Sequence, residues 1–461
     1  MKELKTYYIQ TFGCQMNYSD SERMHTYLQA LGFKEVKSLK EADIVMFNTC
    51  SIKQKADDKA FGTLKPLKQK SRDGNVIIVL SGCMTRVSSS RYSEKRDPLF
   101  NQVNNLDIAI KTEDLYMLAG LLRELNPEIK IKDIEEEKLE EFFEIKATND
   151  SFESGVQAFL PISNGCDKFC TYCIVPYSRG REKSRSMDIV LKEAEELVAS
   201  GVKEIVLLGQ TVNSYGLSAY DKKEKTFEFL DNTEPFPYLL EQLDKLYEKG
   251  LRRVRWTSPH PKDLSDKLID TMATLRTQMP YIHLPIQSGS DACLKRMNRP
   301  ETSGRYREIF TKLREKIPDI SITTDYIVGF CGETEEEFME SYNFYDEIGF
   351  EQAFISQYSD RKGTVANKTM KDDVPKTVKH ARWHRLNDLL KVHAKKSLER
   401  FVGRTIEVLI ESKDNNLYTG KCPNYRTVQF ESTNENLLGE ILPVKITSSK
   451  EWVLRGEFTS Q

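Results

Sequence analysis

The sequence predicts an α/β protein of three consecutive domains. We expect an N-terminal doubly wound parallel-sheet domain at 1–147, a central partial (β/α)6 barrel of TIM type at 148–397, and a small, OB-like C-terminal antiparallel β-barrel at 398–461. Three observations predict this order: three apolar runs that each end in a cysteine, six later apolar runs that alternate with helical patterns, and a final series of short apolar runs separated by turn residues.

The first domain repeats an extended apolar run, a cysteine and a helix-like stretch. The runs KTYYIQTFGC, ADIVMFNTC and NVIIVLSGC end at Cys14, Cys50 and Cys83. The carboxyl ends of parallel strands line one crevice of a doubly wound sheet, so we expect these cysteines to converge; three unrelated core or loop cysteines are the alternative. Ser19 and Glu22 have the spacing of a capping box, which predicts the start of the first helix.

The second domain follows an acidic stretch at 132–146, which predicts a linker with edge structure. Its six apolar runs are VQAFLPIS, EIVLLGQ, RRVRWTS, YIHLPIQ, ITTDYIVGF and EQAFISQYS. In a barrel of this type the functional groups lie at the carboxyl ends of the strands. Thr334 with Glu337 predicts another capping box after the fifth strand.

The third domain is predicted from the short runs RTIEVLIES, LYTGKCP, RTVQFES and LLGEILPVKITSS. Small barrels of this kind commonly hold oligonucleotides, and a purely structural cap is the alternative.

Charge does not mark the chain as a nucleic-acid-binding protein, because 68 basic residues stand against 70 acidic ones. Any contact with RNA must therefore be local. One basic excess contains Arg179, Arg181 and Arg185, and a second surrounds Trp383 in a predicted helix. A solvated surface is the alternative for both.

No long apolar run is present, and the start MKELKTYYIQTFGC lacks the apolar region of a signal peptide. We therefore predict a cytoplasmic protein with no membrane partner. Cysteines stay reduced in that compartment, so the nine cysteines indicate metal ligands, catalysis or buried packing before disulfides.

A third cysteine group, Cys166, Cys170 and Cys173, has the spacing C-x3-C-x2-C at the end of the first barrel strand. Three thiolates on one short loop can hold a four-iron, four-sulfur cluster and leave one iron open for a substrate or cofactor. A zinc site that takes a distant fourth ligand is the alternative.

With Tyr172 as its aromatic residue, this loop resembles the radical S-adenosylmethionine signature C-x3-C-x-aromatic-C. LLGQTVNSYG, HLPIQSGSD and DYIVGFCGETEEEF are similar to segments of the radical SAM methylthiotransferases, and the last domain resembles the RNA-binding TRAM domain. Within that branch, TFGCQMNYSDSE and NGCDKFCTYCIVPYSRGRE resemble MiaB-type tRNA methylthiotransferases. GCMTRV and QYSDRKGTVA depart from the more usual versions of those segments.

The resemblance implies an enzyme that adds a methylthio group to C2 of N6-isopentenyladenosine beside the tRNA anticodon. It implies S-adenosyl-L-methionine and two 4Fe-4S clusters as cofactors, and tRNA, a reducing electron donor and a sulfur donor as partners. Cys166, Cys170 and Cys173 would hold the cofactor cluster, where S-adenosylmethionine is cleaved to a radical. The three N-terminal cysteines would hold an auxiliary cluster that carries the sulfur. We find no convincing Ser-His-Asp set or paired carboxylates.

Two other function classes remain open. One is methylthiolation of threonylcarbamoyl-adenosine tRNA or of a ribosomal protein, and the other is a non-enzymatic, metal-containing RNA-binding protein.

Polar contacts to the cofactor are expected from residues at or near strand ends. These are Tyr172 through its backbone, Gly209, Gln210, Asn213, Gln287 and Ser288. His260 and His283 are as consistent with a structural role as with a cofactor contact. Cys293, Cys331 and Cys422 belong to neither triad, and we expect them to be packing residues.

Overall fold

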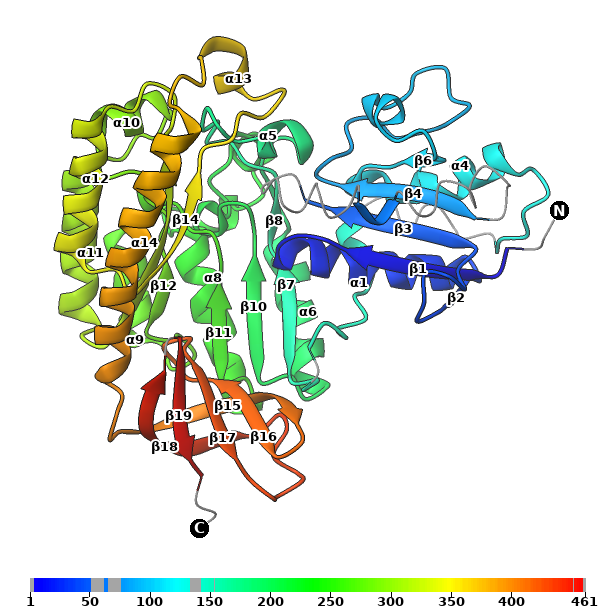
Figure 1. The fold of residues 1–461 in the computed structure, drawn as a ribbon. Helices are drawn as coiled ribbons and strands as arrows, with labels where there is room; N and C mark the ends of the chain where they lie inside the picture. Colours follow the sequence, from blue (N-terminus) through cyan, green and yellow to red (C-terminus); the bar gives the residue numbers. More distant parts are fainter. Residues whose placement is uncertain are drawn as a thin grey trace. The chain divides into compact units, whose positions relative to one another are not determined.

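The computed structural model of the protein describes residues 4–50, 62–64, 76–132, 142–152, 154–450 and 452–458 (Figure 1). Tertiary contacts divide the chain into two compact units. The first comprises Met1–Ser151 and Ile174–Arg181, and the second comprises Phe152–Cys173 and Glu182–Gln461. Within the described ranges, no helix is long and apolar enough to cross a membrane.

The first unit is built on a six-stranded sheet of order β2-β1-β3-β4-β6-β5. Its strands are β1 (Thr6–Thr11), β2 (Lys34–Glu35), β3 (Ile44–Thr49), β4 (Ile77–Gly82), β5 (Ser89–Ser90) and β6 (Ile108–Ala109). Each neighbouring pair is parallel except β5 and β6. Among the described residues of this unit, the α-helices with known bounds are α1 (Gln15–Ala30), α4 (Leu118–Leu125) and α5 (Val175–Ser178). Shorter 3-10 turns are η2 (Pro98–Asn101), η3 (Thr112–Met117) and η5 (Phe142–Glu144). The predicted doubly wound sheet is confirmed.

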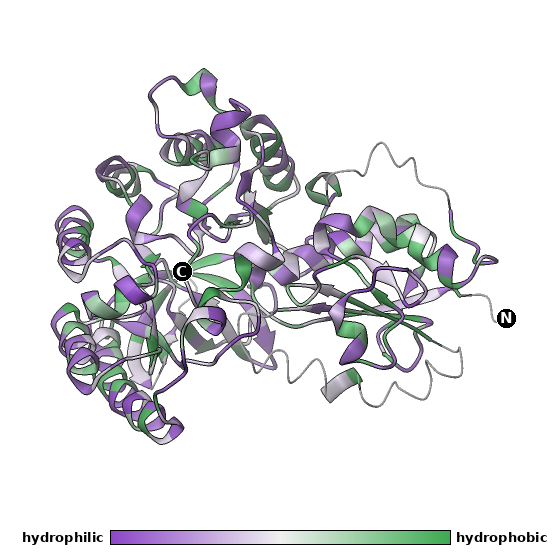
Figure 2. Ribbon diagram, turned by 90° about the horizontal axis from the view of Figure 1, so that it is seen from above, coloured by the Kyte–Doolittle hydropathy of each residue, from purple (hydrophilic) through white to green (hydrophobic). Residues whose placement is uncertain are grey.

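The sheet of the first unit is buried on both faces, as a parallel sheet requires. Along β3, Ile44 and Met46 pack into one apolar cluster, whereas Val45 and Phe47 pack into another. The central strands β3 (IVMFNT) and β4 (IIVLSG) are mostly hydrophobic, and Figure 2 shows green, the colour of hydrophobic residues, within this sheet. The continuous apolar runs seen in the sequence are therefore explained by core on both sides.

The predicted helix start in the first unit is wrong. Helix α1 has Cys14 as its N-cap and begins at Gln15, so Ser19 and Glu22 lie inside the helix and are buried. The acidic stretch predicted as a linker lies mostly outside the described residues, apart from its two ends.

The second unit contains the predicted partial barrel. Six parallel strands form two three-stranded sheets, β11-β10-β7 and β12-β13-β14. The strands are β7 (Gln157–Pro161), β10 (Glu204–Leu208), β11 (Arg253–Trp256), β12 (Tyr281–His283), β13 (Ser321–Val328) and β14 (Gln352–Gln357). Each one falls within a predicted run, except that β13 begins one residue earlier, at Ser321. A small antiparallel pair, β8 (Ser163–Asn164) and β9 (Lys183–Ser184), follows β7.

Helices follow the strands, and most of them share one large apolar core with the strands. They are α6 (Met187–Ala199), α7 (Ala219–Lys223), α8 (Pro235–Asp244), α9 (Asp266–Thr274), α10 (Asp291–Arg296), α11 (Ser303–Lys316), α12 (Glu335–Ile348), α13 (Val365–Thr369) and α14 (Lys376–Glu399). The 3-10 turns are η6 (Val212–Ser214), η7 (Glu228–Leu230), η8 (Lys245–Lys249) and η9 (Pro261–Asp263). Thr334 and Glu337 form the predicted capping box at the start of α12.

The chain ends in a closed barrel of order β15-β16-β17-β19-β18. The strands are β15 (Thr405–Asp414), β16 (Leu417–Lys421), β17 (Thr427–Glu431), β18 (Ile441–Lys450) and β19 (Val453–Glu457). The prediction of a small barrel is confirmed, although β19 was not predicted and it pairs in parallel with β17. The domain boundaries stay predictions.

Of two buried glutamates in the second unit, Glu204 binds side chains of the partial barrel itself, and Glu351 links the partial barrel to the C-terminal barrel. Glu204 on β10 accepts hydrogen bonds from Arg255 at 2.9 Å and from Gln157 at 2.9 Å. Glu351, just before β14, pairs with Arg426 at 2.5 Å and with Arg400 at 3.0 Å.

Arg253 and Arg255 on β11 reach further, to main-chain carbonyls of the C-terminal barrel. Arg253 donates to Lys421 O at 2.8 Å, and Arg255 donates to Cys422 O at 3.1 Å and to Pro423 O at 3.0 Å. The C-terminal barrel is therefore attached through buried, hydrogen-bonded charges.

Candidate functional sites

The three N-terminal cysteines come together in the first unit. Cys14 precedes α1, Cys50 follows β3 and Cys83 follows β4. The Cys50 thiol is hydrogen-bonded to both Cys14 and Cys83, which raises the pKa of Cys50. The hydrogen bond with Cys50 lowers the pKa of Cys14 to about 7. The predicted convergence at the strand ends is confirmed.

A buried amide network supports this triad. Asn17 Oδ1 lies 3.4 Å from Cys14 Sγ and 3.3 Å from the Cys14 backbone nitrogen, which donates to it. The Asn17 amide nitrogen donates to Asn48 Oδ1 and to Thr49 O, each at 3.1 Å. Helix α1 is thereby tied to the end of β3 beside two of the cysteines.

Gly82 makes the turn into Cys83 possible. Its φ is +88°, and a Cβ at this position would collide with the carbonyl oxygen of Thr49. We expect Gly82→Ala to lower the free energy of unfolding by more than about 1–2 kcal/mol, the cost of a left-handed backbone for a residue with a Cβ, because the collision adds to it. Chemical denaturation followed by circular dichroism measures the change.

Gly120 in α4 supplies the matched control, since nothing lies within 4 Å of a Cβ built there. Gly120→Ala should leave stability unchanged or raise it by up to about 1 kcal/mol, as in other helices. Equal stability of the two variants would contradict the argument about Gly82.

The Cys166–Cys173 loop lies at the carboxyl end of β7 in the second unit. Cys166 Sγ is 3.3 Å from Thr211 Oγ1, and the Cys173 backbone nitrogen donates to Cys170 O at 2.9 Å. The Thr171 backbone nitrogen donates to Met297 O at 3.0 Å, and the Thr171 carbonyl oxygen accepts from the Ala366 backbone nitrogen at 2.8 Å. Burial raises the pKa of Cys166.

Charged side chains surround this loop. Arg299 Nη1 lies 3.9 Å from Cys170 Sγ and 3.5 Å from the Tyr172 hydroxyl, and Arg299 is ion-paired with Glu301. His260 Nε2 is 3.9 Å from Glu301 Oε2, and burial lowers the pKa of His260 well below its usual value. His260, Arg299 and Glu301 are all buried.

Several buried polar atoms near the loop have no hydrogen-bond partner among the described residues. They are Ser163 Oγ, Gln210 Oε1, His260 Nε2, Arg299 Nε and Glu301 Oε2. Buried polar groups are normally satisfied, so such a set at a strand end fits a polar ligand that completes it. A cofactor with amino, carboxylate and hydroxyl groups meets that requirement.

Within the described ranges, no three His, Cys, Asp or Glu side chains are arranged to hold a single metal ion. An iron–sulfur cluster makes a different demand, because each thiolate binds its own iron and the ligands need not meet at one point. Thiol-only donor sets of this kind suit soft metal centres. Both triads therefore fit clusters better than a lone zinc ion.

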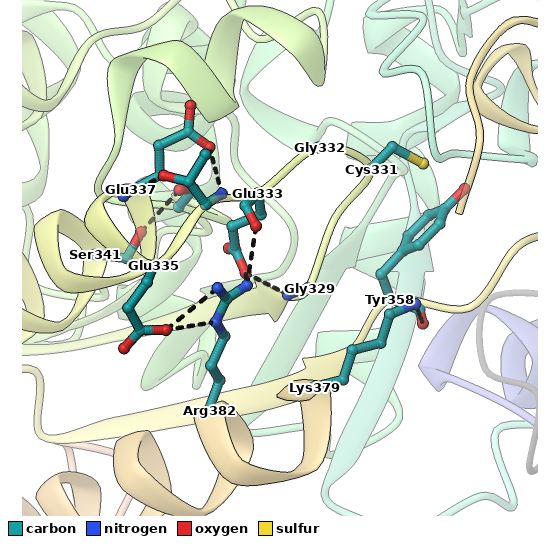
Figure 3. Close-up of polar contacts among 12 residues, drawn as sticks. Gly329, Cys331, Gly332, Glu333, Glu335, Glu337, Ser341, Tyr358, Lys379 and Arg382 are labelled. Carbon is teal, nitrogen blue, oxygen red and sulfur yellow. Dashed lines mark hydrogen bonds and ion pairs between the residues drawn. The ribbon is translucent and has the colours of Figure 1, made fainter. Parts of the chain in front are cut away.

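The loop after β13 is fixed by α14 (Figure 3). Glu333 accepts hydrogen bonds from the Gly329 backbone nitrogen at 2.6 Å and from Arg382 Nη1 at 2.8 Å. Arg382 also bonds Glu335 at 3.3 Å, at the start of α12. This loop, part of the segment DYIVGFCGETEEEF that resembles the radical SAM methylthiotransferases, is thus fixed by side-chain hydrogen bonds at the carboxyl end of its strand.

The residues predicted to contact the cofactor have different surroundings. The Asn213 side-chain amide makes two hydrogen bonds with the backbone of His260. Its Nδ2 donates to His260 O at 3.0 Å, and its Oδ1 accepts from the His260 backbone nitrogen at 2.7 Å. The Ser288 hydroxyl is 2.9 Å from that of Ser341, and Gln287 has a φ of 79°. A Cβ on Gly209 would lie 2.5 Å from Ser163 Oγ. Their contacts to the cofactor stay predictions.

Tyr172 is placed differently from these polar residues. Its ring packs edge-on against Phe330, at 6.4 Å between centroids, in a small apolar cluster. The contact predicted for its backbone stays a prediction.

The residues predicted to bind RNA are also unlike one another. Arg179 is buried, whereas Arg181 is exposed. Arg185 donates to Pro161 O at 2.7 Å, and the Trp383 indole donates to Ile355 O at 2.9 Å. Their contact with RNA stays a prediction.

The remaining cysteines are packing residues, as predicted. Cys293 and Cys331 are buried in the apolar cluster that contains Phe330, and Cys422 is buried in the core of the C-terminal barrel. Sequence reasoning missed Arg299 and Glu301, which follow α10 and carry no motif of their own.

Comparison with known proteins agrees with this arrangement. Residues 160–345 match the Radical SAM superfamily, residues 6–101 match the Uncharacterized protein family UPF0004, and residues 399–459 match the TRAM domain. A solved radical S-adenosylmethionine methyltransferase, TsrM from Kitasatospora setae, has a TM-score of 0.53 at 13% identity and covers 76% of this chain and 73% of its own. That likeness concerns the fold alone.

Sequence relatives cover nearly the whole chain. A tRNA-2-methylthio-N(6)-dimethylallyladenosine synthase of Thermoanaerobacter sp. (strain X514) is 40% identical over 457 residues, 98% of this chain and 92% of that protein. A synthase of the same name from Clostridium perfringens (strain SM101 / Type A) is 37% identical over 460 residues, 98% of this chain and 97% of that protein.

The fold, the C-x3-C-x2-C loop and the family match define a radical S-adenosylmethionine enzyme, whose cofactors are S-adenosylmethionine and 4Fe-4S clusters. Within that class, the chain belongs to the family of the tRNA-2-methylthio-N(6)-dimethylallyladenosine synthases, the MiaB-type methylthiotransferases.

Proposed function

We propose that the protein adds a methylthio group to C2 of N6-isopentenyladenosine next to the tRNA anticodon, giving 2-methylthio-N6-isopentenyladenosine. The observation that carries the proposal is near full-length similarity to synthases of that name in a chain that has two separate cysteine triads at strand ends. The reaction also needs a reducing electron donor and a sulfur donor. A tRNA substrate places it in the cytoplasm.

Each part of the chain has a distinct task in this proposal. Cys166, Cys170 and Cys173 hold the cluster that binds S-adenosylmethionine, and the unpartnered polar atoms around the loop orient that cofactor. Cys14, Cys50 and Cys83 hold the auxiliary cluster that presents the sulfur. The C-terminal barrel and the basic surface residues hold the tRNA.

When bound, the clusters and the cofactor supply one-electron chemistry and the sulfur and methyl groups, which no acid or base side chain offers at an unactivated carbon. The protein orients the target base and excludes water from it. An anticodon-loop base leaves its stack at lower cost than a paired base does, which suits this substrate.

Mass spectrometry of tRNA nucleosides tests the substrate. A strain that lacks the protein should accumulate N6-isopentenyladenosine, and the restored gene should return the methylthio form. Loss of methylthio groups only from threonylcarbamoyl-adenosine or from a ribosomal protein would contradict the proposal. Absence of iron and labile sulfide after anaerobic purification would instead indicate a non-enzymatic RNA-binding protein.

Replacing Cys14, Cys50 and Cys83 together with alanine tests the division of tasks. The variant should keep about four of about eight irons. It should still cleave S-adenosylmethionine reductively to 5′-deoxyadenosine, because the other triad belongs to a different unit, yet form no methylthio product. Iron analysis and chromatography of the products measure both. An unchanged iron content would rule out the auxiliary site.

A further inference from the structure

A buried arginine in the first unit contacts the N-terminal cysteine triad. Arg179 donates from Nε to Cys83 Sγ at 3.3 Å and from Nη2 to Asp20 Oδ2 at 2.6 Å. The side chains of Arg179 and Asp20 are 5% and 0% exposed. A buried ion pair at hydrogen-bonding distance from a thiol is unlike a solvated surface charge, and it requires a specific reason.

Asp20 lies on α1, the helix that Cys14 caps. Its Oδ2 fixes one nitrogen of the planar guanidinium, so the Nε–H of the same rigid group is held toward Cys83. Asp20 Oδ1 has no hydrogen-bond partner among the described residues. The carboxylate is therefore committed to the arginine and not to a wider network.

We propose that Arg179 is a positioning residue for the auxiliary cluster: it places a hydrogen-bond donor and a positive charge on the Cys83 sulfur, and Asp20 holds it there. The inference rests on the proposed function, because it requires the triad to hold a cluster. Cysteine binds metal as the thiolate, and a fixed cation beside the sulfur stabilises that form. Hydrogen bonds to ligating sulfurs and nearby charge also set the reduction potential of a cluster.

The position of Arg179 in the sequence adds a second point. Arg179 follows Cys173 by only six residues, and the stretch Ile174–Arg181 belongs by its contacts to the first unit. One continuous motif, CTYCIVPYSRG, therefore contains the last two cysteines of the second triad and the arginine that lies beside the N-terminal triad. This accounts for a basic residue that charge alone would assign to an RNA-binding surface.

The direction of the effect follows from charge. Reduction adds an electron to the cluster, and a neighbouring cation favours the more negative state. Removing the cation while keeping the packing, as in Arg179→Met, should make the auxiliary cluster harder to reduce. Arg179→Lys should lie between the wild type and this variant, since it restores the charge without the planar geometry.

The test uses the full-length protein with Cys166, Cys170 and Cys173 replaced by alanine, so that only the auxiliary cluster remains. After anaerobic reconstitution, redox titration followed by electron paramagnetic resonance gives its midpoint potential. We expect Arg179→Met to change the ratio of reduced to oxidised cluster about tenfold at a fixed potential, which is about 59 mV more negative for one electron. Arg181→Met, which removes an exposed cation of the same segment, should leave the potential unchanged.

Three outcomes decide the inference. Full iron content with a wild-type potential in Arg179→Met would overturn it. Equal loss of iron in Arg179→Met and Arg179→Lys, with unchanged circular dichroism, would also overturn it, because space and not charge would then matter. Iron loss in Arg179→Met that Arg179→Lys restores would support it. Failure of the parent protein to bind iron would refute the proposed auxiliary site itself.

Discussion

Replacing Cys166, Cys170 and Cys173 together with alanine is expected to abolish methylthio transfer and to lower the iron content from about eight to about four. The physical reason is that, in the proposed function, this triad supplies all the protein ligands of the cluster that binds S-adenosylmethionine, and no acid or base can replace its chemistry. Formation of 5′-deoxyadenosine should vanish as well, unlike in the variant that lacks the N-terminal triad. Iron analysis and product chromatography under anaerobic conditions provide the measurement.

The matched control is Cys331→Ala, because Cys331 is also buried in the second unit but packs in an apolar cluster. It should keep about eight irons and its cleavage activity. A triple variant that retained eight irons, or a Cys331→Ala variant that lost four, would show that the ligands have been assigned wrongly.

Glu204→Gln should lower the free energy of unfolding by about 3–5 kcal/mol, the usual cost of leaving a buried charge without its partner. Glu204 lies 2.9 Å from Arg255 Nε and 4.0 Å from Arg253 Nη1, and all three side chains are less than 5% exposed. Glutamine keeps the shape of the Glu204 side chain but removes its negative charge. The buried guanidinium groups of Arg253 and Arg255 then lose the carboxylate with which they pair. Chemical denaturation followed by circular dichroism gives the value.

Glu241→Gln is the control, because Glu241 pairs with Lys267 at 2.6 Å on a partly exposed surface. Exposed pairs contribute about 0–1 kcal/mol, so this variant should remain close to the wild type. Similar effects of the two substitutions would mean that the network around Glu204 is not a buried electrostatic link.

This network also changes how the C-terminal barrel should be tested. Deleting it would remove the main-chain acceptors of Arg253 and Arg255, so a truncated chain would lose stability together with any RNA site. Point changes of exposed basic residues, measured by tRNA binding at several salt concentrations, separate the two effects. Binding carried by phosphate contacts should fall steeply with salt.

The strands were predictable because apolar runs and their spacing carry the information. Convergence of Cys14, Cys50 and Cys83 followed from their equal positions at the ends of parallel strands, which is a property of topology. The start of α1 was not predictable in the same way. Cysteine is not a preferred N-cap residue, whereas the Ser19–Glu22 spacing matches a capping box that the helix does not use.

The environment of Arg179 could not be predicted from the sequence. Its charge and neighbours resemble those of an exposed basic patch, and its burial depends on Asp20, 159 residues away. Strand β19 was missed for a related reason: VLRGE is short and half polar, and its place in the barrel depends on pairing with β17 and β18. Long-range partners decide both cases.

The attachment of the C-terminal barrel has a consequence for evolution. Arg253 and Arg255 bind carbonyl oxygens of Lys421, Cys422 and Pro423, and every residue type offers such an oxygen. Mutations that reshape the barrel's outer surface can therefore accumulate without loosening its attachment, provided that the path of its backbone and the buried Arg426 are kept. The residues on the outer surface of the C-terminal barrel can therefore change faster in evolution than the residues that attach it to the partial barrel.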